Sequence, residues 1–76
     1  MSKELVEYVV KSLVDDPGSV VVTEVEGKSA IVLEISVNAN DMGRLIGKRG
    51  RVINAIRTLT QVYGAREGKR IAVEVV

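Results

Sequence analysis

The chain has 76 residues and a mass of 8.2 kDa, which allows one small hydrophobic core, because so short a chain buries only about 60% of its unfolded surface. It contains neither cysteine nor histidine, which excludes disulfides, thiolate nucleophiles and the commonest general base and metal ligand. Residues 1–41 carry three basic and eight acidic side chains, whereas residues 42–76 carry eight basic and two acidic ones. We therefore expect a single domain, residues 1–76, whose second half binds an anion, the alternative being a solvated basic face.

The opening segment predicts an amphipathic helix that ends before Pro17. Its apolar residues recur at spacings of three and four, at Leu5, Val6, Val9, Val10, Leu13 and Val14. The helix stops at Asp15-Asp16, because the residue before a proline avoids helical geometry. Acidic residues at positions 4 and 7 argue against a secretory leader, and no apolar run is long enough to cross a membrane. The expected location is the cytoplasm.

Two β-strands joined by a tight turn follow. Residues 19–26 are rich in β-branched side chains, and residues 30–37 alternate, with Ile31, Leu33, Ile35 and Val37 on one face. Only Gly27-Lys28-Ser29 separates the two runs. This spacing predicts an antiparallel hairpin.

Two helices and a third strand complete the pattern. Asn40 or Asp41 is expected to cap a short helix, and a longer helix follows Gly50, with Gly64 expected to end it. Residues 70–76 alternate as a strand does. The order α-β-β-α-α-β predicts an α+β domain, a three-stranded sheet with the helices packed on one face.

Gly47-Lys48-Arg49-Gly50 interrupts the helical pattern and is the candidate anion-binding segment. Glycine lets the backbone turn sharply and approach a ligand closely. Such a turn exposes amide donors at the start of the next helix, where an anion is favoured. Around it stand three further cations and two apolar side chains, Arg44, Arg51, Arg57, Ile46 and Ile53. The segment predicts an apolar groove edged by charge that binds a sugar–phosphate backbone, the alternative being a solvated glycine-rich turn.

Other ways of binding nucleotides fit the sequence badly. Three residues separate Gly43 from Gly47, and no Ser or Thr follows Lys48, so the loop is not a Walker A motif. Tyr8 and Tyr63 are the only aromatic residues and lie at apolar helical positions, which favours the core or an interface over base stacking. Both loop glycines are expected to be exposed, so that aspartates there repel phosphate without disturbing the fold.

The run Ile46-Gly47-Lys48-Arg49-Gly50-Arg51-Val52-Ile53 resembles the signature of the KH RNA-binding domain, whose Gly-x-x-Gly loop clamps about four backbone nucleotides. A loop that follows one helix and two strands resembles the type II KH arrangement, and Asn54–Leu59 is similar to the small stand-alone bacterial KhpA family. The resemblance covers the whole chain. It implies a non-catalytic protein that binds single-stranded RNA. Gly47, Lys48, Arg49 and Gly50 would form the clamp, and Ile46 and Ile53 would line the groove for bases.

The resemblance also implies how the protein assembles and acts. It implies a homodimer, or a heterodimer with a larger KH protein of the KhpB (Jag) type, with the contact surface near the glycine loop and the helix starting at Arg51. It further implies post-transcriptional regulation or RNA chaperoning that affects cell division, cell shape and cell-wall growth. The 2′-hydroxyl that separates RNA from single-stranded DNA needs one well-placed group, which the sequence does not identify.

Two other function classes compete with this interpretation. The first is a protein-interaction module, whose KH fold mainly assembles a complex with another KH protein. The second is an enzyme, which is disfavoured because no histidine, cysteine or metal-ligand cluster accompanies the carboxylates. No cofactor, metal, small-molecule substrate or membrane contact is expected.

Overall fold

The computed structural model describes residues 2–76, and its elements follow the predicted order. Within this range the chain forms α1 (Ser2–Leu13), β1 (Val21–Glu26), β2 (Ala30–Ser36), α2 (Met42–Ile46), α3 (Arg51–Arg66) and β3 (Arg70–Val75). Three short 3₁₀ turns, Pro17–Ser19, Ala39–Asp41 and Lys48–Gly50, lie between these elements. None of the helices in the described range is long and apolar enough to cross a bilayer.

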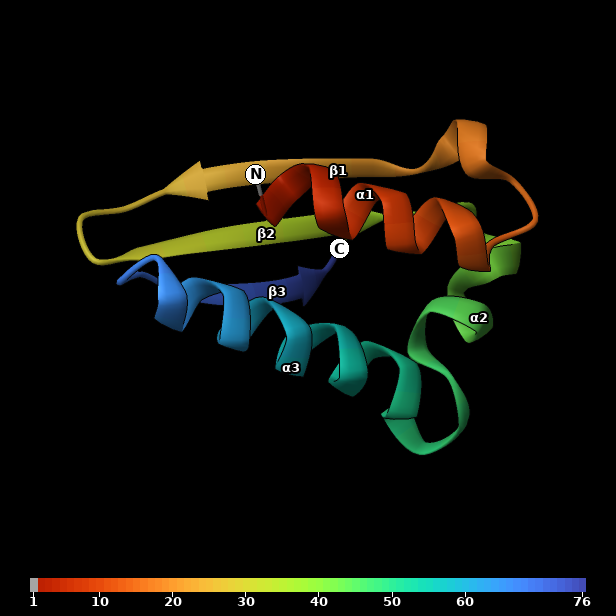
Figure 1. Cartoon of the computed structure of the whole chain (residues 1–76). Coiled ribbons are helices and arrows are strands. Elements are labelled where there is room, and N and C mark those ends of the chain that lie inside the picture. Colours follow the sequence, from red (N-terminus) through yellow and green to blue (C-terminus); the bar gives the residue numbers. More distant parts are fainter. Residues whose placement is uncertain (1) are drawn as a thin grey trace.

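The strands form one mixed sheet in the order β1-β2-β3. β1 and β2 are antiparallel, with Val22 opposite Ile35, which confirms the predicted hairpin. β3 runs parallel to β2, with Leu33 opposite Val73. Both α1 and α3 cover the same face of this sheet (Figure 1), which confirms the predicted α+β fold with its helices on one face.

The core lies between the helices and the sheet. Leu33 and Ile35 of β2 are fully buried, and Val6 and Val10 of α1 cover them from the helix side. Leu45 of α2 is also fully buried. Because truncating such a side chain costs about 2–5 kcal/mol, Leu45 anchors the short helix that leads into the glycine loop.

Asp41 joins the segment after α1 to the beginning of α2. Only 2% of this residue is exposed. Its two carboxylate oxygens accept hydrogen bonds from the backbone N–H groups of Asp15 at 3.1 Å and Asp16 at 3.0 Å. Asp41 occupies the predicted N-cap position of α2 but makes no side-chain capping bond to it. The side chain that does cap here is that of Asn38, which accepts from the Asn40 N–H at the start of the 3₁₀ turn Ala39–Asp41.

Asp16 extends this set of contacts. Its Oδ2 accepts hydrogen bonds from the Ser19 hydroxyl at 2.6 Å and from the Asn38 side-chain amide at 3.1 Å. The Ser19 bond, followed by the Asn38 bond, holds the pKa of the Asp16 carboxyl below its ordinary value, because both donors favour the ionised form.

One expectation about the helices is wrong. α3 does not end at Gly64 but continues to Arg66. Gly64 is buried, and a Cβ there would lie 2.5 Å from the backbone oxygen of Lys69, so this glycine allows α3 to pack closely against the start of β3. Of the two tyrosines expected in the core or at an interface, Tyr63 is half-buried against the core, whereas Tyr8 is 73% exposed, which leaves the interface as its alternative.

Candidate nucleic-acid interface

The glycine loop connects α2 to α3 in a conformation that requires glycine at its first position. The Gly47 N–H donates to Gly43 O at 2.8 Å and ends α2, and the Gly50 N–H donates to Gly47 O at 3.1 Å. Gly47 has φ 77° and ψ 170°, a region essentially confined to glycine. A Cβ at Gly47 would lie 2.4 Å from Val52 Cγ2 and 2.8 Å from the Val52 backbone nitrogen. The expectation that an aspartate would fit here without disturbing the fold is therefore wrong.

The other end of the loop is roomier but also left-handed. Gly50 has φ 76° and ψ 15°, and a Cβ there would meet nothing closer than Asn54 Nδ2 at 3.5 Å. Arg49 is the one non-glycine residue with positive φ in the described range, at φ 57° and ψ 27°, a conformation that costs about 1–2 kcal/mol. Backbone strain of this kind clusters at functional sites.

The loop gathers positive charge and unoccupied backbone donors. Lys48, Arg49 and Arg51 are exposed, and no ion pair joins any of them to a carboxylate within residues 2–76. Gly50 provides no side-chain cap for α3, which leaves the amides of its first turn facing the loop, where an anion is favoured. Arg44 is also exposed, but its Nε lies 3.4 Å from Asp15 Oδ2, so its charge is partly neutralised.

The two isoleucines expected to line the groove differ in burial. Ile46 is half-buried and packs against the core. Ile53 is 4% exposed and belongs to the core itself, because it falls on the single buried stripe of α3 with Ile56, Thr60 and Gly64. Ile53 therefore offers very little surface to a base, and Ile46 is the better placed of the two.

Arg57 lies away from the loop, in a groove between α3 and the outer edge of β3. The groove has a volume of about 760 Å³, and on the α3 side it is lined by Arg57, Gln61 and Ala65. These three residues are spaced four apart and so share one face of the helix. Arg57 was predicted from the sequence, whereas Gln61, Ala65 and the strand edge were not, although the spacing of four from Arg57 indicates the two helical residues.

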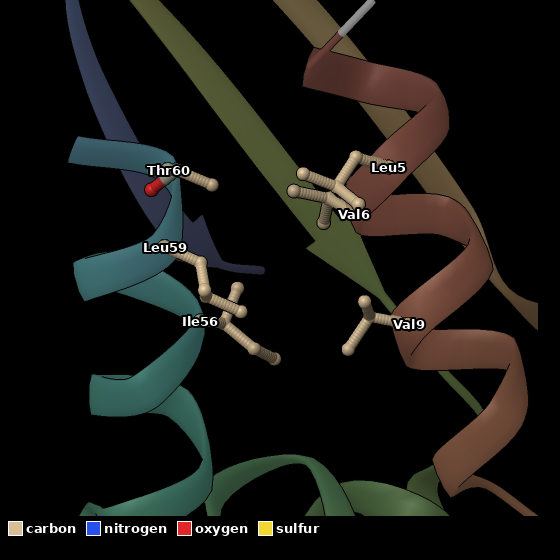
Figure 2. Close-up of a pocket in the computed structure, with 6 residues that line it drawn as sticks. All are labelled: Leu5, Val6, Val9, Ile56, Leu59 and Thr60. Carbon is tan, nitrogen blue, oxygen red and sulfur yellow. The ribbon is translucent and has the colours of Figure 1, made fainter. Parts of the chain in front are cut away.

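A second surface feature is apolar and lies over the seam between α1 and α3. Leu5 and Val9 of α1 face Ile56 and Leu59 of α3 across a gap of about 10 Å³ (Figure 2), which is barely room for one water molecule. Leu59 is 53% exposed. We call Leu5, Val9 and Leu59 the helix-seam patch, beneath which the buried Ile56 lies.

The fold and the loop together define a class of protein. A helix and an antiparallel hairpin precede a Gly-x-x-Gly turn between a short and a long helix, and the last strand lies parallel to the central one. This is the arrangement of a type II KH domain. A family model described as "KhpA/KhpB, KH domain" matches residues 3–75. The chain belongs to this family of KH domains, which is not a family of enzymes.

Similar proteins cover the chain almost completely. It is 49% identical over 74 residues to the RNA-binding protein KhpA of Clostridium perfringens, covering 97% of this chain and 99% of that protein. It is 41% identical over 73 residues to the RNA-binding protein KhpA of Aquifex aeolicus, covering 96% and 92%.

Solved structures confirm the fold. Aquifex aeolicus Era bound to GDP.AlF4- superposes with a TM-score of 0.67 at 24% identity, over 97% of this chain. Era in complex with MgGDPNP and nucleotides 1506-1542 of 16S ribosomal RNA gives a TM-score of 0.66, also at 24% identity and over 97% of this chain. The chain spans only 29% and 28% of these two Era chains.

Proposed function

We propose that this protein binds single-stranded RNA, with the phosphates held by the glycine loop and the bases in the α3–β3 groove. The observation that carries the proposal is the loop itself. Its backbone is held in a strained turn, and its two tip cations have no carboxylate partner in the described chain. The relatives named RNA-binding protein KhpA, at up to 49% identity among those compared, support RNA as the ligand.

In this proposal the glycine loop contacts the phosphates and the α3–β3 groove contacts the bases. Lys48 and Arg49 extend from the loop as mobile charges suited to phosphate, which positions a strand without reading its sequence. The groove beside β3 offers neutral backbone groups along a free strand edge, which suit the hydrogen-bonding edges of unpaired bases. Ile46, at the end of α2, supplies apolar surface beside the loop.

Fluorescence anisotropy with a labelled RNA heptamer tests this proposal. Gly50→Asp places a carboxylate in the loop where space allows a side chain, and we expect it to abolish binding while the circular dichroism spectrum stays unchanged. Gly68→Asp is the matched control, since Gly68 also has positive φ, at 71°, and open space around it, but lies outside the loop. Unchanged binding by a folded Gly50→Asp protein would remove the loop from the mechanism.

Single cation substitutions sharpen the test. Lys48→Ala and Arg49→Ala should each weaken binding by the same factor for RNAs of different sequence, because phosphate contacts carry no base information. Each should also reduce the slope of log affinity against log salt by about 0.7, the value for one lost contact to a single strand. A change in sequence preference with an unchanged slope would contradict the assignment to phosphate.

The biological role follows from the family resemblance. We propose a non-catalytic post-transcriptional regulator or RNA chaperone that works in the cytoplasm. Crosslinking and sequencing of bound RNA in the native cell, with Gly50→Asp as the control, identifies its targets. An RNA profile identical to that of the control would contradict the role.

A second candidate function is self-association through the helix-seam patch. The supporting observation is the exposure of Leu59, joined by Tyr8 at 73% and Val62 at 58% one turn farther along each helix. So small a core leaves a stability that an interface would raise. We propose a homodimer as the occupant, and the interface then lies farther along α3 than the loop-proximal surface that the family resemblance implies. Pairing with a KhpB-type KH protein is the heterodimeric form.

Sedimentation equilibrium across protein concentration tests the dimer. We expect Leu59→Lys to dissociate it and Val21→Lys to leave it intact, because Val21 is equally exposed, at 55%, but lies on β1. A single 8.2 kDa species at high micromolar concentration would contradict the homodimer. A dimer that survives Leu59→Lys would place the interface elsewhere.

A further inference from the structure

Arg57 is fixed in the wall of the α3–β3 groove by two hydrogen bonds. Its Nε donates to the backbone oxygen of Val73 on β3 at 3.2 Å, and its Nη1 donates to Asn54 Oδ1 at 3.3 Å. Asn54 in turn has its Nδ2 3.5 Å from the position that a Cβ on Gly50 would occupy. The side chain of the half-buried residue Arg57 is thus held between Asn54, in the first turn of α3, and the edge of the sheet.

Val73 belongs to the set of β3 residues whose backbone groups face the outer edge. Just beyond β3, the Val76 N–H donates to Ile35 O of β2 at 3.0 Å. The backbone N–H and C=O groups of successive strand residues alternate in direction, so positions 72 and 74 also face β2, whereas Ile71 and Val73 face outward. The bond from Arg57 to Val73 O agrees with this direction. An edge strand leaves such groups without a ladder partner.

Hydrogen-bond donors therefore predominate at this point of the groove. A guanidinium has five N–H donors and no acceptor, and the two bonds of Arg57 leave about three of its donors for a ligand. Val73 adds its outward N–H, while its oxygen already accepts from Arg57. Planar donors in a fixed fork pair best with two adjacent acceptors.

Among the four bases, two present a pair of adjacent acceptors on one edge. Guanine offers O6 and N7, and cytosine offers O2 and N3. In uracil the N3–H donor separates O2 from O4. In adenine the amino group separates N1 from N7, and C2–H separates N1 from N3, so neither base offers two adjacent acceptors. The Arg57 side chain is held in place by its two hydrogen bonds. Lys48 and Arg49 differ from it, because they are exposed at the loop tip and are free to follow a phosphate.

We infer that Arg57 is a specificity-determining residue, which selects at one nucleotide of the bound strand a base with two adjacent acceptors, cytosine or guanine, over adenine and uracil. This inference rests on the proposed RNA binding and adds a base preference to it. Removal of the Arg57 side chain deletes the donor fork and with it the basis of this preference.

Anisotropy titrations with labelled heptamers of cytidine, uridine and adenosine test the inference, because a homopolymer presents the same base in every register. A uridine heptamer with one central guanosine tests guanine. We expect the wild-type protein to bind the cytidine heptamer about tenfold or more tightly than the adenosine heptamer, since one bidentate base contact is worth about 1–3 kcal/mol of discrimination. The guanosine-containing heptamer should likewise exceed the uridine heptamer.

Two substitutions separate base reading from a structural role. Arg57→Ala should bring the cytidine-to-adenosine ratio close to one. Arg57→Lys keeps the charge but loses the fork, and should lose the same preference while keeping the salt slope. Arg66→Ala removes an exposed arginine from the last turn of α3, outside the groove lining, and is the control that should keep the preference. Thermal melting confirms that each variant is folded.

The results distinguish failure of this inference from failure of RNA binding itself. Equal weakening of all heptamers by both Arg57 variants would make Arg57 a phosphate contact and overturn the inference. A wild-type protein without base preference would overturn it too. Failure of the proposed function would give a different result. The Arg49→Ala and Gly50→Asp proteins would then bind every heptamer as tightly as the wild type.

Discussion

Alanine substitutions at the two loop glycines should have clearly different effects on stability. At Gly47, the backbone conformation costs a non-glycine residue about 1–3 kcal/mol, and the new Cβ must also displace Val52, which would lie 2.4 Å away. Overpacking of this kind costs about 1–3 kcal/mol more. At Gly50 the left-handed conformation costs about 1–2 kcal/mol, and the nearest atom is at an ordinary distance of 3.5 Å.

The unfolded chain reduces both effects, because alanine lowers its conformational entropy by about 0.4–1 kcal/mol. We therefore expect Gly47→Ala to lower the free energy of unfolding by about 2 kcal/mol more than Gly50→Ala does. For a domain of this size, that difference corresponds to about 8–16 °C in Tm.

Urea unfolding followed by circular dichroism measures the difference directly. The two variants should share one m value and differ in their midpoints. If the free energies of unfolding of the two variants agree within about 0.5 kcal/mol, Val52 and the backbone of residue 47 do not jointly require glycine. A Gly47→Ala protein as stable as the wild type would refute this requirement more strongly.

Three further predictions concern the loop and the contacts that support it. Arg49→Gly should raise the free energy of unfolding, measured in urea, by about 1 kcal/mol, since glycine adopts the left-handed conformation freely. It should also weaken RNA binding, measured by anisotropy. A variant that gains no stability contradicts the strain at Arg49. Asp41→Asn should lower the free energy of unfolding by about 1–3 kcal/mol, because it replaces one of the two buried oxygens that accept from the Asp15 and Asp16 N–H groups with a donor. An unchanged urea midpoint would refute this. Asp16 has its pKa lowered on folding, chiefly by the Ser19 hydroxyl, so its contribution is fully present above the ordinary aspartate pKa and is lost as pH falls through the lower folded value. The urea midpoint of Asp16→Asn should accordingly fall less than that of the wild type on acidification, and parallel pH profiles would refute the assignment.

The sequence predicted the order and nature of the elements because each has a local signal. The alternation of Ile31, Leu33 and Ile35 and the three-residue turn before them specify the hairpin without reference to the rest of the chain. The prediction failed at Gly64, where packing against Lys69 decides the residue type and the helix continues past it. For Tyr8, the sequence left the core and an interface open, since an apolar helical position does not reveal which element covers it.

The site was predictable only in part, for related reasons. The cations and glycines of the loop are adjacent in sequence, so their motif identifies them together. The groove joins α3 to the outer edge of β3, and the pairing of Arg57 with Val73 across it is a long-range contact that periodicity does not contain. The special requirement at Gly47 likewise depends on where the Val52 side chain lies.

The parallel pairing of β3 with β2 has a consequence for the way the protein folds. β1 and β2 are neighbours along the chain, but β3 reaches β2 only after the whole of segment 37–69 has been laid down between them. Such non-local pairing pays its loop-closure entropy before it gains any contacts, and is therefore slow. The α3–β3 groove has only its helical wall until β3 is in place. If RNA binds as proposed, a nascent chain still lacking this strand would present the glycine loop without the complete groove proposed to read bases. Sequence discrimination would thus be the last property to appear during synthesis, and the first to disappear if the strand frayed.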